Sequence, residues 1–332
     1  MERKLVKVAV DAMGGDYAPQ EIVKGAIQAA QKDGIELILV GSEDAIQREL
    51  EKYDVSELPI RVVNASEVIR DGESPVAALR QKPDASISVA TQLVKTGEAD
   101  AVMSMGSTGA VMVSAIETLG KLEGIKRPVA GTNLLGLAPN TVVFDLGPNA
   151  DCKPRDLLNF AVIGCVVARK ILHINNPTVA LLSTGSEEGK GNLLVNRAYQ
   201  LFKESNLNFI GNVEGNDIPR GKANVIICDG FTGNILIKFC EGLGDSVIER
   251  LRVTLDKHLS KEELDAISDD LFALTHVADM SGGGMIYGVN GMVWIGHGRS
   301  KAPQVTKSMR QVKLAVEANL LEELRSELGK LQ

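Results

Sequence analysis

The chain alternates between two spacings of apolar residues. Short runs rich in β-branched residues are followed by stretches whose apolar residues recur every three or four positions, which is typical of βαβ units that build a largely parallel sheet. The short runs predict strands at residues 5–11, 36–41, 60–65, 100–104, 141–145, 178–183, 207–211 and 223–228. The longer stretches predict helices at residues 19–33, 43–53, 75–82, 85–97, 107–121, 155–172, 187–204 and 232–257. The pattern therefore indicates an α/β fold.

The pattern changes after residue 257. Residues 260–275 predict an amphipathic helix, and residues 285–295 predict a hairpin that turns at Asn290-Gly291, a strong turn pair. A last helix, beginning near Lys301, is predicted from an apolar stripe with three- and four-residue intervals. Its members are Val305, Met309, Val312, Val316, Leu320, Leu324 and Leu328. Because no repeat or linker interrupts the chain, we expect one domain over residues 1–332 that can contain two intertwined subdomains.

Glycine is over-represented, and it gathers where the predicted strands end. It accounts for 33 of 332 residues, above the usual share of about 7%. The glycine-rich loops are residues 11–16, 106–109, 147–151, 183–192 and 229–234. Parallel sheets bind ligands beyond the carboxyl ends of their strands, where helix N-termini present free N–H groups. Together these loops favour an anion site, although each one alone could serve only as a turn.

Two polar residues stand out within these loops. Lys190 falls in the first turn of the predicted helix 187–204, where the helix dipole disfavours a cation unless an anion lies nearby. The alternative is a salt bridge to Glu187 or Glu188. Asn234 follows Gly233 at a predicted strand-to-helix junction, where its amide could donate to a developing oxyanion or cap the helix. No loop matches a P-loop or GxGxxG fingerprint, so a nucleotide cofactor is not supported.

The net charge of −7 argues against nonspecific nucleic-acid binding, which depends on Lys and Arg neutralising phosphates. Four cysteines show neither a CxxC pair nor nearby histidines, so no zinc site or disulfide framework is indicated and a reducing cytoplasm is expected. The longest apolar run, residues 157–168, is shorter than the ~18 residues of a membrane span. Residues 1–11 are interpreted as a first strand, not as a signal peptide.

Taken together, the loops resemble one family, the PlsX-type phosphate acyltransferases. The most specific match is the opening run Val8-Ala9-Val10-Asp11-Ala12-Met13-Gly14-Gly15-Asp16-Tyr17-Ala18-Pro19. The match continues in order through residues 104–110, 149–154, 187–192, 211–215, 228–234 and 296–298. It therefore extends over essentially the whole chain.

The departures from the family pattern are local. The family usually has Asn at Ser107, Asn-Ile-Gly-Glu at residues 183–186, Ala at Pro148 and Ser at Arg299. All of these positions lie in predicted loops. They bear on details of the ligand shell, above all on an amide contact at Ser107.

The resemblance implies a three-layer α/β/α fold with a mostly parallel mixed sheet, similar to isocitrate and isopropylmalate dehydrogenases, and a homodimer. It implies that inorganic phosphate attacks the thioester of a long-chain acyl carrier protein, without a cofactor or metal, and yields acyl phosphate for phosphatidic acid and phospholipid synthesis. Lys190 and Asn234 match the family's catalytic positions. The substrate and phosphate site is expected at Asp11, Gly14, Gly15, Asp16, Gly106, Ser107, Thr108, Gly109, Asn149, Gly185, Asp229, Gly230, Gly233 and His297.

Because the carrier protein is acidic and this chain has a net negative charge, the carrier is expected to bind a local basic patch. The last helix offers Lys301, Lys307, Arg310 and Lys313, with no acid between residues 300 and 316, although such a run can also be a solvated face. The amphipathic helices of residues 247–277 are expected to pack on each other; pairing with a dimer mate or lying on a membrane are the alternatives. The resemblance implies peripheral membrane contact and contact with a membrane glycerol-3-phosphate acyltransferase.

Two other functions remain compatible with the sequence. A metal-dependent 2-hydroxyacid dehydrogenase could share the α/β pattern, although the loops lack an adenine-nucleotide motif. A noncatalytic scaffold for lipid-synthesis enzymes is an alternative of a different class. Catalytic turnover by the purified protein would distinguish an enzyme from a noncatalytic scaffold.

Overall fold

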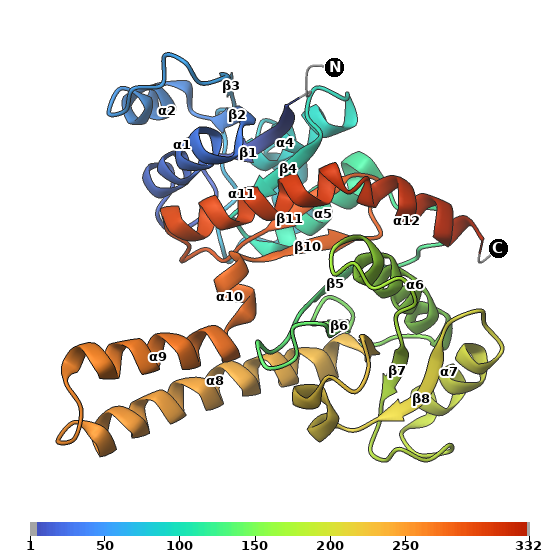
Figure 1. Ribbon diagram of the computed structural model, residues 1–332. Helices are drawn as coiled ribbons and strands as arrows, with labels where there is room; N and C mark the ends of the chain where they lie inside the picture. Colours follow the sequence, from blue (N-terminus) through green and yellow to red (C-terminus); the bar gives the residue numbers. More distant parts are fainter. Residues whose placement is uncertain (1–4, 331–332) are drawn as a thin grey trace. The chain divides into compact units, whose positions relative to one another are not determined.

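The computed structural model describes residues 5–330. Within this range the chain forms two compact units (Figure 1). Unit 1 combines the residues up to Gly124 with those from Ser281 onwards, whereas unit 2 is the continuous segment Ile125–Met280. Unit 1 is therefore completed only after the chain has built unit 2.

Unit 1 is built on a six-stranded sheet in the order β3-β2-β1-β4-β11-β10, in which only β10 runs antiparallel to its neighbour. Its strands are β1 (Val6–Asp11), β2 (Ile35–Gly41), β3 (Ile60–Asn64), β4 (Ala101–Ser104), β10 (Gly284–Tyr287) and β11 (Met292–Ile295). Its helices are α1 (Gln20–Asp33), α2 (Glu43–Leu50), α3 (Pro75–Gln81), α4 (Ser86–Lys95), α5 (Thr108–Leu119), α11 (Ala302–Glu317) and α12 (Leu320–Gly329).

Both faces of this sheet are covered by helices. Alternate strand residues point to opposite faces, and Ala9 of β1 packs with Val102 of β4 in a core that α4 and α5 complete. On the other face α1 and α11 lie side by side (Figure 1). Gly25 permits this close approach, because a Cβ there would overlap the Ala302 carbonyl and the Val305 side chain. Unit 1 thus has a helix, sheet and helix layer.

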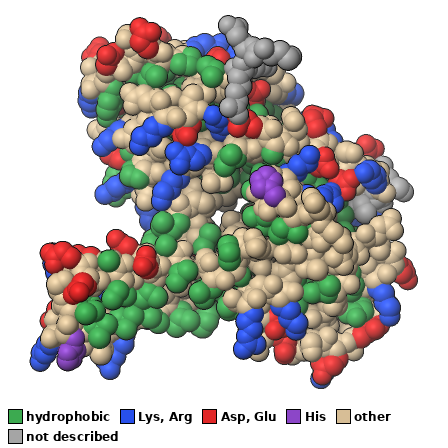
Figure 2. Space-filling view, in the orientation of Figure 1, with side chains coloured by type: hydrophobic (Ala, Val, Ile, Leu, Met, Phe, Trp, Pro, Cys, Tyr) green, Lys and Arg blue, Asp and Glu red, His purple; other side chains and the backbone are tan. Residues whose placement is uncertain are grey.

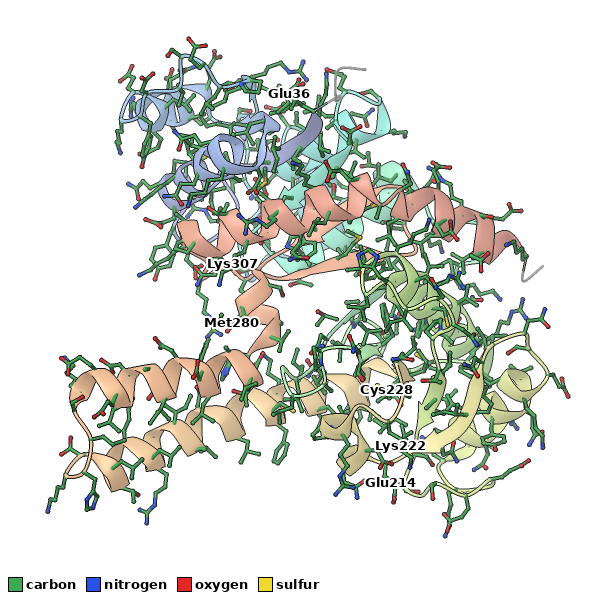
Figure 3. The ribbon with its side chains drawn as sticks, viewed as in Figure 1. Glu36, Glu214, Lys222, Cys228, Met280 and Lys307 are labelled. Atoms are coloured by element: carbon green, nitrogen blue, oxygen red, sulfur yellow. The ribbon has the colours of Figure 1, made fainter. Side chains whose placement is uncertain are left out.

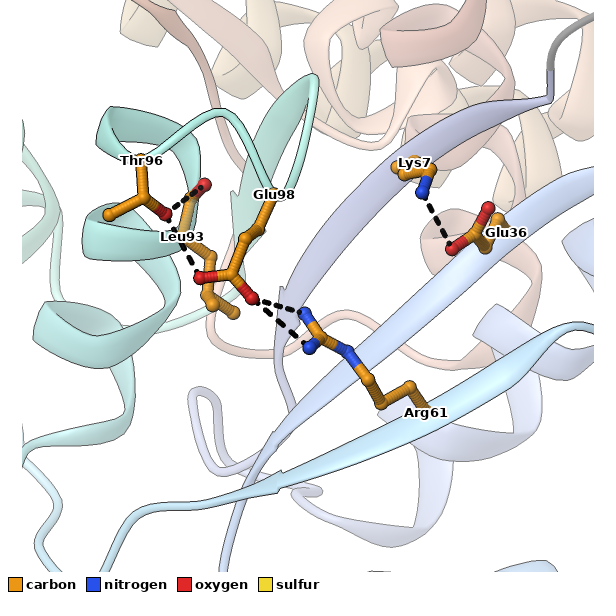
Figure 4. Close-up of polar contacts among 6 residues, drawn as sticks. All are labelled: Lys7, Glu36, Arg61, Leu93, Thr96 and Glu98. Atoms are coloured by element: carbon orange, nitrogen blue, oxygen red, sulfur yellow. Dashed lines mark hydrogen bonds and ion pairs between the residues drawn. The ribbon is translucent and has the colours of Figure 1, made fainter.

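Surface ion pairs connect neighbouring strands and loops of unit 1 (Figure 4). Lys7 of β1 lies 3.3 Å from Glu36 of β2. Arg61 of β3 binds Glu98 at 3.0 Å and lowers the pKa of that carboxyl. These side chains are 30–50% exposed, so the ion pairs add little to stability, and they lie at the end of the strands opposite to the glycine loops.

Unit 2 contains a second sheet, in the order β5-β6-β9-β7-β8, in which β5 runs antiparallel to β6 and the other pairs are parallel. Its strands are β5 (Val129–Thr132), β6 (Val142–Phe144), β7 (Val179–Leu182), β8 (Phe209–Val213) and β9 (Val225–Ile227). Its helices are α6 (Pro154–Lys170), α7 (Leu193–Lys203), α8 (Gly230–Leu255), α9 (Lys261–Thr275) and the 3₁₀ helix η1 (Gly215–Arg220); α10 (Val277–Ser281) leads back to unit 1. Helices α6 and α7 contact one sheet face, and the first turns of α8 pack on the other.

The rest of α8 pairs with α9 in a long helical hairpin (Figure 1). This confirms the expectation that the amphipathic helices of residues 247–277 pack on each other: Gly244 lies against Thr275, and Arg252 binds Asp265 at 2.8 Å. Hydrophobic side chains nevertheless gather on the outside of this hairpin (Figure 2). Along α8, from its first turn into the hairpin, exposed hydrophobic side chains recur at every fourth residue, namely Phe231, Ile235, Phe239, Leu243 and Val247. We call these five residues the α8 row.

The sequence pattern is confirmed for most elements, including the β10–β11 hairpin, and differs from the structure at several places. The short antiparallel strand β5 carries no alternation that marks it as a strand, so it was not expected. The predicted helix 187–204 begins only at Leu193, because Gly189 and Gly191 have φ angles of +91° and +98° that a helix does not tolerate. Helix α8 begins at Gly230, ahead of the predicted residue 232. The single last helix breaks at Asn319, which has a φ of +53°.

The fold prediction itself is confirmed: a mostly parallel, mixed sheet is flanked by helices on both faces in each unit. In the part of the chain that the structure describes, no helix combines the length and the apolar character needed to cross a membrane.

Candidate functional site

In unit 1 a buried carboxylate holds two of the glycine loops together. Asp11, at the end of β1, accepts a hydrogen bond of 2.6 Å from the Ser104 hydroxyl, and Ser104 Oγ accepts one of 3.0 Å from the Gly106 N–H. Gly14 fits between them, since a Cβ there would lie 2.6 Å from Asp11 Oδ2. Burial raises the pKa of Asp11 although these hydrogen bonds oppose the rise. Asp11, expected as a substrate ligand, thus holds the loops.

The same loops line a pocket of about 390 Å³ in unit 1. Gly15, Asp16, Gly106 and Ser107 contribute from the predicted site. Arg70 also lines it, without an ion pair in the described residues. Sequence reasoning missed Arg70, because no glycine or motif marks its loop.

The remaining predicted residues of unit 1 lie around this pocket. Thr108 is the exposed first residue of α5, and Gly109 allows Pro75 to pack against that helix. His297 belongs to the loop after β11, and the next residue, Gly298, accepts a hydrogen bond of 2.8 Å from the Asp16 N–H. The structure therefore brings together the loops that follow β1, β4 and β11.

Unit 2 repeats the arrangement with a second buried aspartate. Asp145, immediately after β6, is fully buried and accepts hydrogen bonds from the backbone N–H groups of Gly147 at 3.1 Å and Asn149 at 2.9 Å. The Asn149 amide also donates to Asp145, at 2.7 Å. Burial raises the pKa of Asp145 to about 6. The sequence carries a signal for this residue, because Asp145 and Asp11 are both acids at the end of a buried strand.

Three further predicted residues of unit 2 form hydrogen bonds within the protein. The Asn149 side-chain nitrogen is already engaged, since it also donates to the Pro128 carbonyl at 2.8 Å. Asp229 caps α8 by accepting a hydrogen bond of 2.8 Å from the Thr232 N–H. Gly230 donates its N–H to the Asn149 carbonyl at 2.8 Å. These contacts fix the N-terminus of α8 on the turn that follows β6.

Lys190 lies in the loop before α7, so its placement in a helical first turn is wrong. Asn192 caps α7 instead, with its Oδ1 accepting a hydrogen bond of 2.9 Å from the Val195 N–H. The alternative of a salt bridge to Glu187 or Glu188 is not found in the described chain: Glu188 pairs with Lys203 at 3.3 Å, and the Lys190 ammonium has no ion partner. Its aliphatic part packs on Gly185. Lys190 thus presents a free cation.

Asn234 lies in the first turns of α8, and it does not cap the helix because Asp229 does. Its side chain is exposed and has no hydrogen-bond partner within residues 5–330. Its Oδ1 lies close to the turn after β6, 3.7 Å from where a Cβ on Gly147 would be. The amide therefore remains available to a ligand.

Lys190 lies in the loop after β7, and Asn234 lies in the first turns of α8, which follows β9; β7 and β9 are hydrogen-bonded neighbours. Gly191, next to Lys190, and Thr232, two residues before Asn234, line one cavity with Asp229 and Cys228. Unit 2 thus unites a free ammonium, a free amide and a cavity at one edge of its sheet. Such a group of donors can stabilise an anionic nucleophile and a developing oxyanion.

The expected carrier-docking residues lie along α11. Lys307 projects from the helix, exposed and without an ion partner in the described residues (Figure 3). Arg310 instead binds Asp33 at 3.2 Å, and Lys313 donates to the Asp33 carbonyl and lies 3.8 Å from Glu317. Arg310 and Lys313 are therefore partly used to join α11 to α1.

The raised pKa of Asp145 has a consequence for stability. An aspartate with a pKa of about 6 in the folded state and 3.8 when unfolded holds its proton more tightly in the folded state. Its contribution to the free energy of unfolding therefore falls as the pH rises from 4 to 6, by about 3 kcal/mol in all, at about 1.4 kcal/mol for each pKa unit.

Chemical denaturation of the protein and of Asp145→Asn at several pH values measures this effect. The difference in unfolding free energy, wild type minus variant, should decrease between pH 4 and 7. Asp217 is the control, because the Glu214 N–H and Lys222 lower its pKa, so its contribution is lost as the pH falls below about 4. A flat difference for Asp145→Asn over this range would contradict the assignment.

Comparison with known proteins places the chain in a family. The chain matches the fatty acid synthesis protein family over residues 6–323. It is 44% identical over 333 residues to the phosphate acyltransferase of Heliobacterium modesticaldum, with 98% of this chain and 99% of the relative covered. Among solved structures it is similar to a phosphotransacetylase from Streptococcus pyogenes, with a TM-score of 0.64, 17% identity and coverage of 95% of this chain and 94% of that chain.

A second solved structure supports the dehydrogenase-like fold. It is described as a 4-hydroxythreonine-4-phosphate dehydrogenase from Salmonella typhimurium, with a TM-score of 0.51, 10% identity and coverage of 94% of this chain and 99% of that chain. At such low identities the two structures bear on the fold alone. The sequence match to the relative from Heliobacterium modesticaldum shows the family, because 44% identity extends over nearly the full length of both proteins. The chain belongs to the fatty acid synthesis protein family, the PlsX family of phosphate acyltransferases.

Proposed function

We propose that the protein transfers a long-chain acyl group from acyl carrier protein to inorganic phosphate. A phosphate oxygen attacks the thioester carbonyl, the new carbon–oxygen bond forms, and the carbon–sulfur bond breaks. The carrier thiolate leaves and takes up the proton that the phosphate loses. The acyl phosphate then serves phosphatidic acid and phospholipid synthesis. Relatives that are named phosphate acyltransferases support this reaction class.

The observation that carries the proposal is the pair of free donors at one edge of the unit 2 sheet. The Lys190 ammonium has no ion partner among residues 5–330 and reduces the repulsion between phosphate and the thioester oxygen. Asn234, whose amide the helix does not use, donates to that oxygen as it becomes an oxyanion. Because phosphate is itself the nucleophile, the reaction needs no serine or cysteine nucleophile.

Incubation of the purified protein with long-chain acyl carrier protein tests the proposal directly. Release of free carrier is followed with and without inorganic phosphate, and acyl phosphate is trapped with hydroxylamine. We expect carrier release that depends on phosphate. Release without phosphate, or none at all, would contradict the proposal; the latter result would favour the noncatalytic scaffold. The dehydrogenase alternative is disfavoured by the family match.

Lys307 is proposed to contribute to carrier docking, because it is the exposed cation of α11 that forms no ion pair in the described chain. We expect Lys307→Glu to raise the KM for the acyl carrier protein roughly threefold to tenfold without changing kcat, since charges at an interface rim act mainly on association. Lys95→Glu, an equally exposed change at the end of α4, is the control. An unchanged KM in Lys307→Glu would remove α11 from the docking surface.

The proposed assembly is a homodimer in the cytoplasm. The α8 row supports the dimer: Phe231, Ile235, Phe239 and Leu243 are each at least half exposed, and contiguous apolar surface of this kind typically marks an interaction site. The four cysteines are free thiols, as is usual in a reducing compartment. Contact with the membrane, and with a glycerol-3-phosphate acyltransferase in it, would be transient in this proposal.

A further inference from the structure

A buried carboxylate organises the turn that follows β6. Asp145, the residue after this strand, has no exposed surface. Its Oδ1 accepts one hydrogen bond, of 3.1 Å, from the Gly147 N–H. Its Oδ2 accepts two, of 2.9 and 2.7 Å, from the backbone N–H and the side-chain amide of Asn149. Residues 145–149 therefore form a turn that closes around one carboxylate.

This turn contacts the first turns of α8 at two points. Gly233 of α8 lies so close to the turn that a Cβ there would overlap the Asp145 carbonyl oxygen. Gly147 faces Asn234, since a Cβ on Gly147 would lie 3.7 Å from Asn234 Oδ1 and 4.0 Å from Asn234 Cβ. The conformation of the turn thus limits where the Asn234 amide can point.

The hydrogen-bond pattern of the turn requires an ionised carboxylate. Each carboxylate oxygen has two acceptor positions, and the two donors of Asn149 occupy both of those on Oδ2. A proton would therefore bind Oδ1 and make it a poorer acceptor for the Gly147 N–H. Protonation of Asp145 would loosen the turn at the residue that faces Asn234.

Burial brings this protonation close to neutral pH, because it raises the pKa of Asp145 to about 6 against the effect of the hydrogen bonds. Burial and, after it, nearby carboxylates raise the pKa values of two neighbouring thiols, Cys152 and Cys228. These thiols therefore stay neutral between pH 5 and 8. The other carboxylates that act on them are Asp156 and Asp229. No Lys or Arg of the described chain pairs with Asp145.

We propose that Asp145 is a positioning residue whose ionised carboxylate keeps the Asn234 amide aligned with the thioester oxygen. The identity of the reaction depends on the proposed function. The carboxylate fixes Gly147, and Gly147 restricts the amide only while the turn is closed. Because Asn234 acts on an oxyanion that forms in the transition state, loss of alignment lowers kcat and leaves the KM for phosphate unchanged.

The pH dependence of turnover by Asp145→Asn tests the proposal. An amide keeps the shape of the side chain but has one acceptor oxygen, so the variant has at every pH the loss that protonation causes in the wild type. We expect the wild-type kcat to exceed that of the variant roughly tenfold to hundredfold at pH 7.5, as for a misplaced catalytic group. This ratio should fall toward one between pH 7 and 5, because the wild type then takes up its proton.

The ratio of the two kcat values cancels the titration of phosphate, which both enzymes share. Asp217→Asn is the matched control, because Asp217 is also a buried aspartate of unit 2 that accepts a backbone hydrogen bond. The Glu214 N–H and Lys222 lower its pKa, so its ratio should stay near one from pH 5 to 8. A ratio for Asp145→Asn that does not change with pH, or a raised KM for phosphate, would overturn the proposal.

Nuclear magnetic resonance separates this proposal from the proposed function, because it needs no turnover. In the ¹⁵N-labelled wild type, the Gly147 amide and the Asn234 side-chain amide should shift together with a midpoint near pH 6. These shifts suffice if Asp145→Asn does not fold. If the Asn234 signals do not follow that of Gly147, the positioning role is wrong even where acyl phosphate is formed. If they do follow it but no carrier is released in the phosphate assay, the coupling stands and the proposed function is wrong.

Discussion

Replacement of Lys190 with alanine is expected to lower kcat/KM for acyl phosphate formation by about 10²- to 10³-fold, the loss typical of one electrostatic donor at a reacting centre. Asn234→Ala is expected to have an effect of similar size. Neither side chain has a structural partner within residues 5–330: Lys190 forms no ion pair, and Asp229, not Asn234, caps α8. Their removal should therefore affect turnover and leave stability intact.

Matched variants make this prediction specific. Lys203→Ala removes a nearby lysine that pairs with Glu188 and should retain activity. Asn234→Asp keeps the size of the side chain but replaces the amide donor with a carboxylate, so it should be at least as inactive as Asn234→Ala. Steady-state rates are compared with thermal unfolding of each variant. Near-normal acyl phosphate formation by folded Lys190→Ala and Asn234→Ala would show that the assignment of these residues is wrong.

Addition of one methyl group at Gly233 is expected to disturb the whole edge of the unit 2 sheet. A Cβ at this position would overlap the carbonyl oxygen of Asp145, and the Asp145 backbone is itself held, because its N–H donates to the Cys228 carbonyl at 3.0 Å. Since neither backbone can move freely, we expect a loss of about 1–3 kcal/mol in the free energy of unfolding. The displaced N-terminus of α8 should also lower activity, because it carries Asn234.

Gly242 of the same helix is the control for this change. Beyond the neighbouring backbone of α8 itself, no atom of the described residues lies within 4 Å of a Cβ at Gly242, so Gly242→Ala should stabilise the protein by about 0.5–1 kcal/mol through helix propensity alone. Thermal unfolding compares the two variants. Equal stability of Gly233→Ala and Gly242→Ala would contradict the tight packing of α8 on the turn after β6.

Local patterns explain which parts of the fold could be predicted. The apolar run of β1 and the stripes of the long helices are properties of neighbouring residues, so periodicity alone identifies them. Periodicity does not identify the start of α7. The predicted helix includes residues 187–192, but the positive φ angles of Gly189 and Gly191 prevent a helix there. Asn319 interrupts the last helix for the same reason.

In the candidate site, too, the sequence predicts where residues lie along the chain but not which partners they bind. The sequence placed Asp11, Asn149 and Asp229 in ligand loops, and each of them does lie at a strand end. Their hydrogen bonds, however, go to Ser104, Pro128 and Thr232. A sequence does not reveal whether a polar side chain already has a partner, because that partner is usually distant along the chain.

By itself, the sequence determined the α/β class, the glycine loops at the strand ends and the resemblance to one enzyme family, because all three depend only on local spacing and residue type. Only the tertiary structure decided that unit 1 is assembled from both ends of the chain and that Asp145 is buried. It also decided that Lys190 and Asn234 are free beside a cavity without cations in its described lining. Burial and hydrogen-bond pairing arise between residues far apart in sequence, and they alone distinguish a residue that supports the site from one that is available to a ligand.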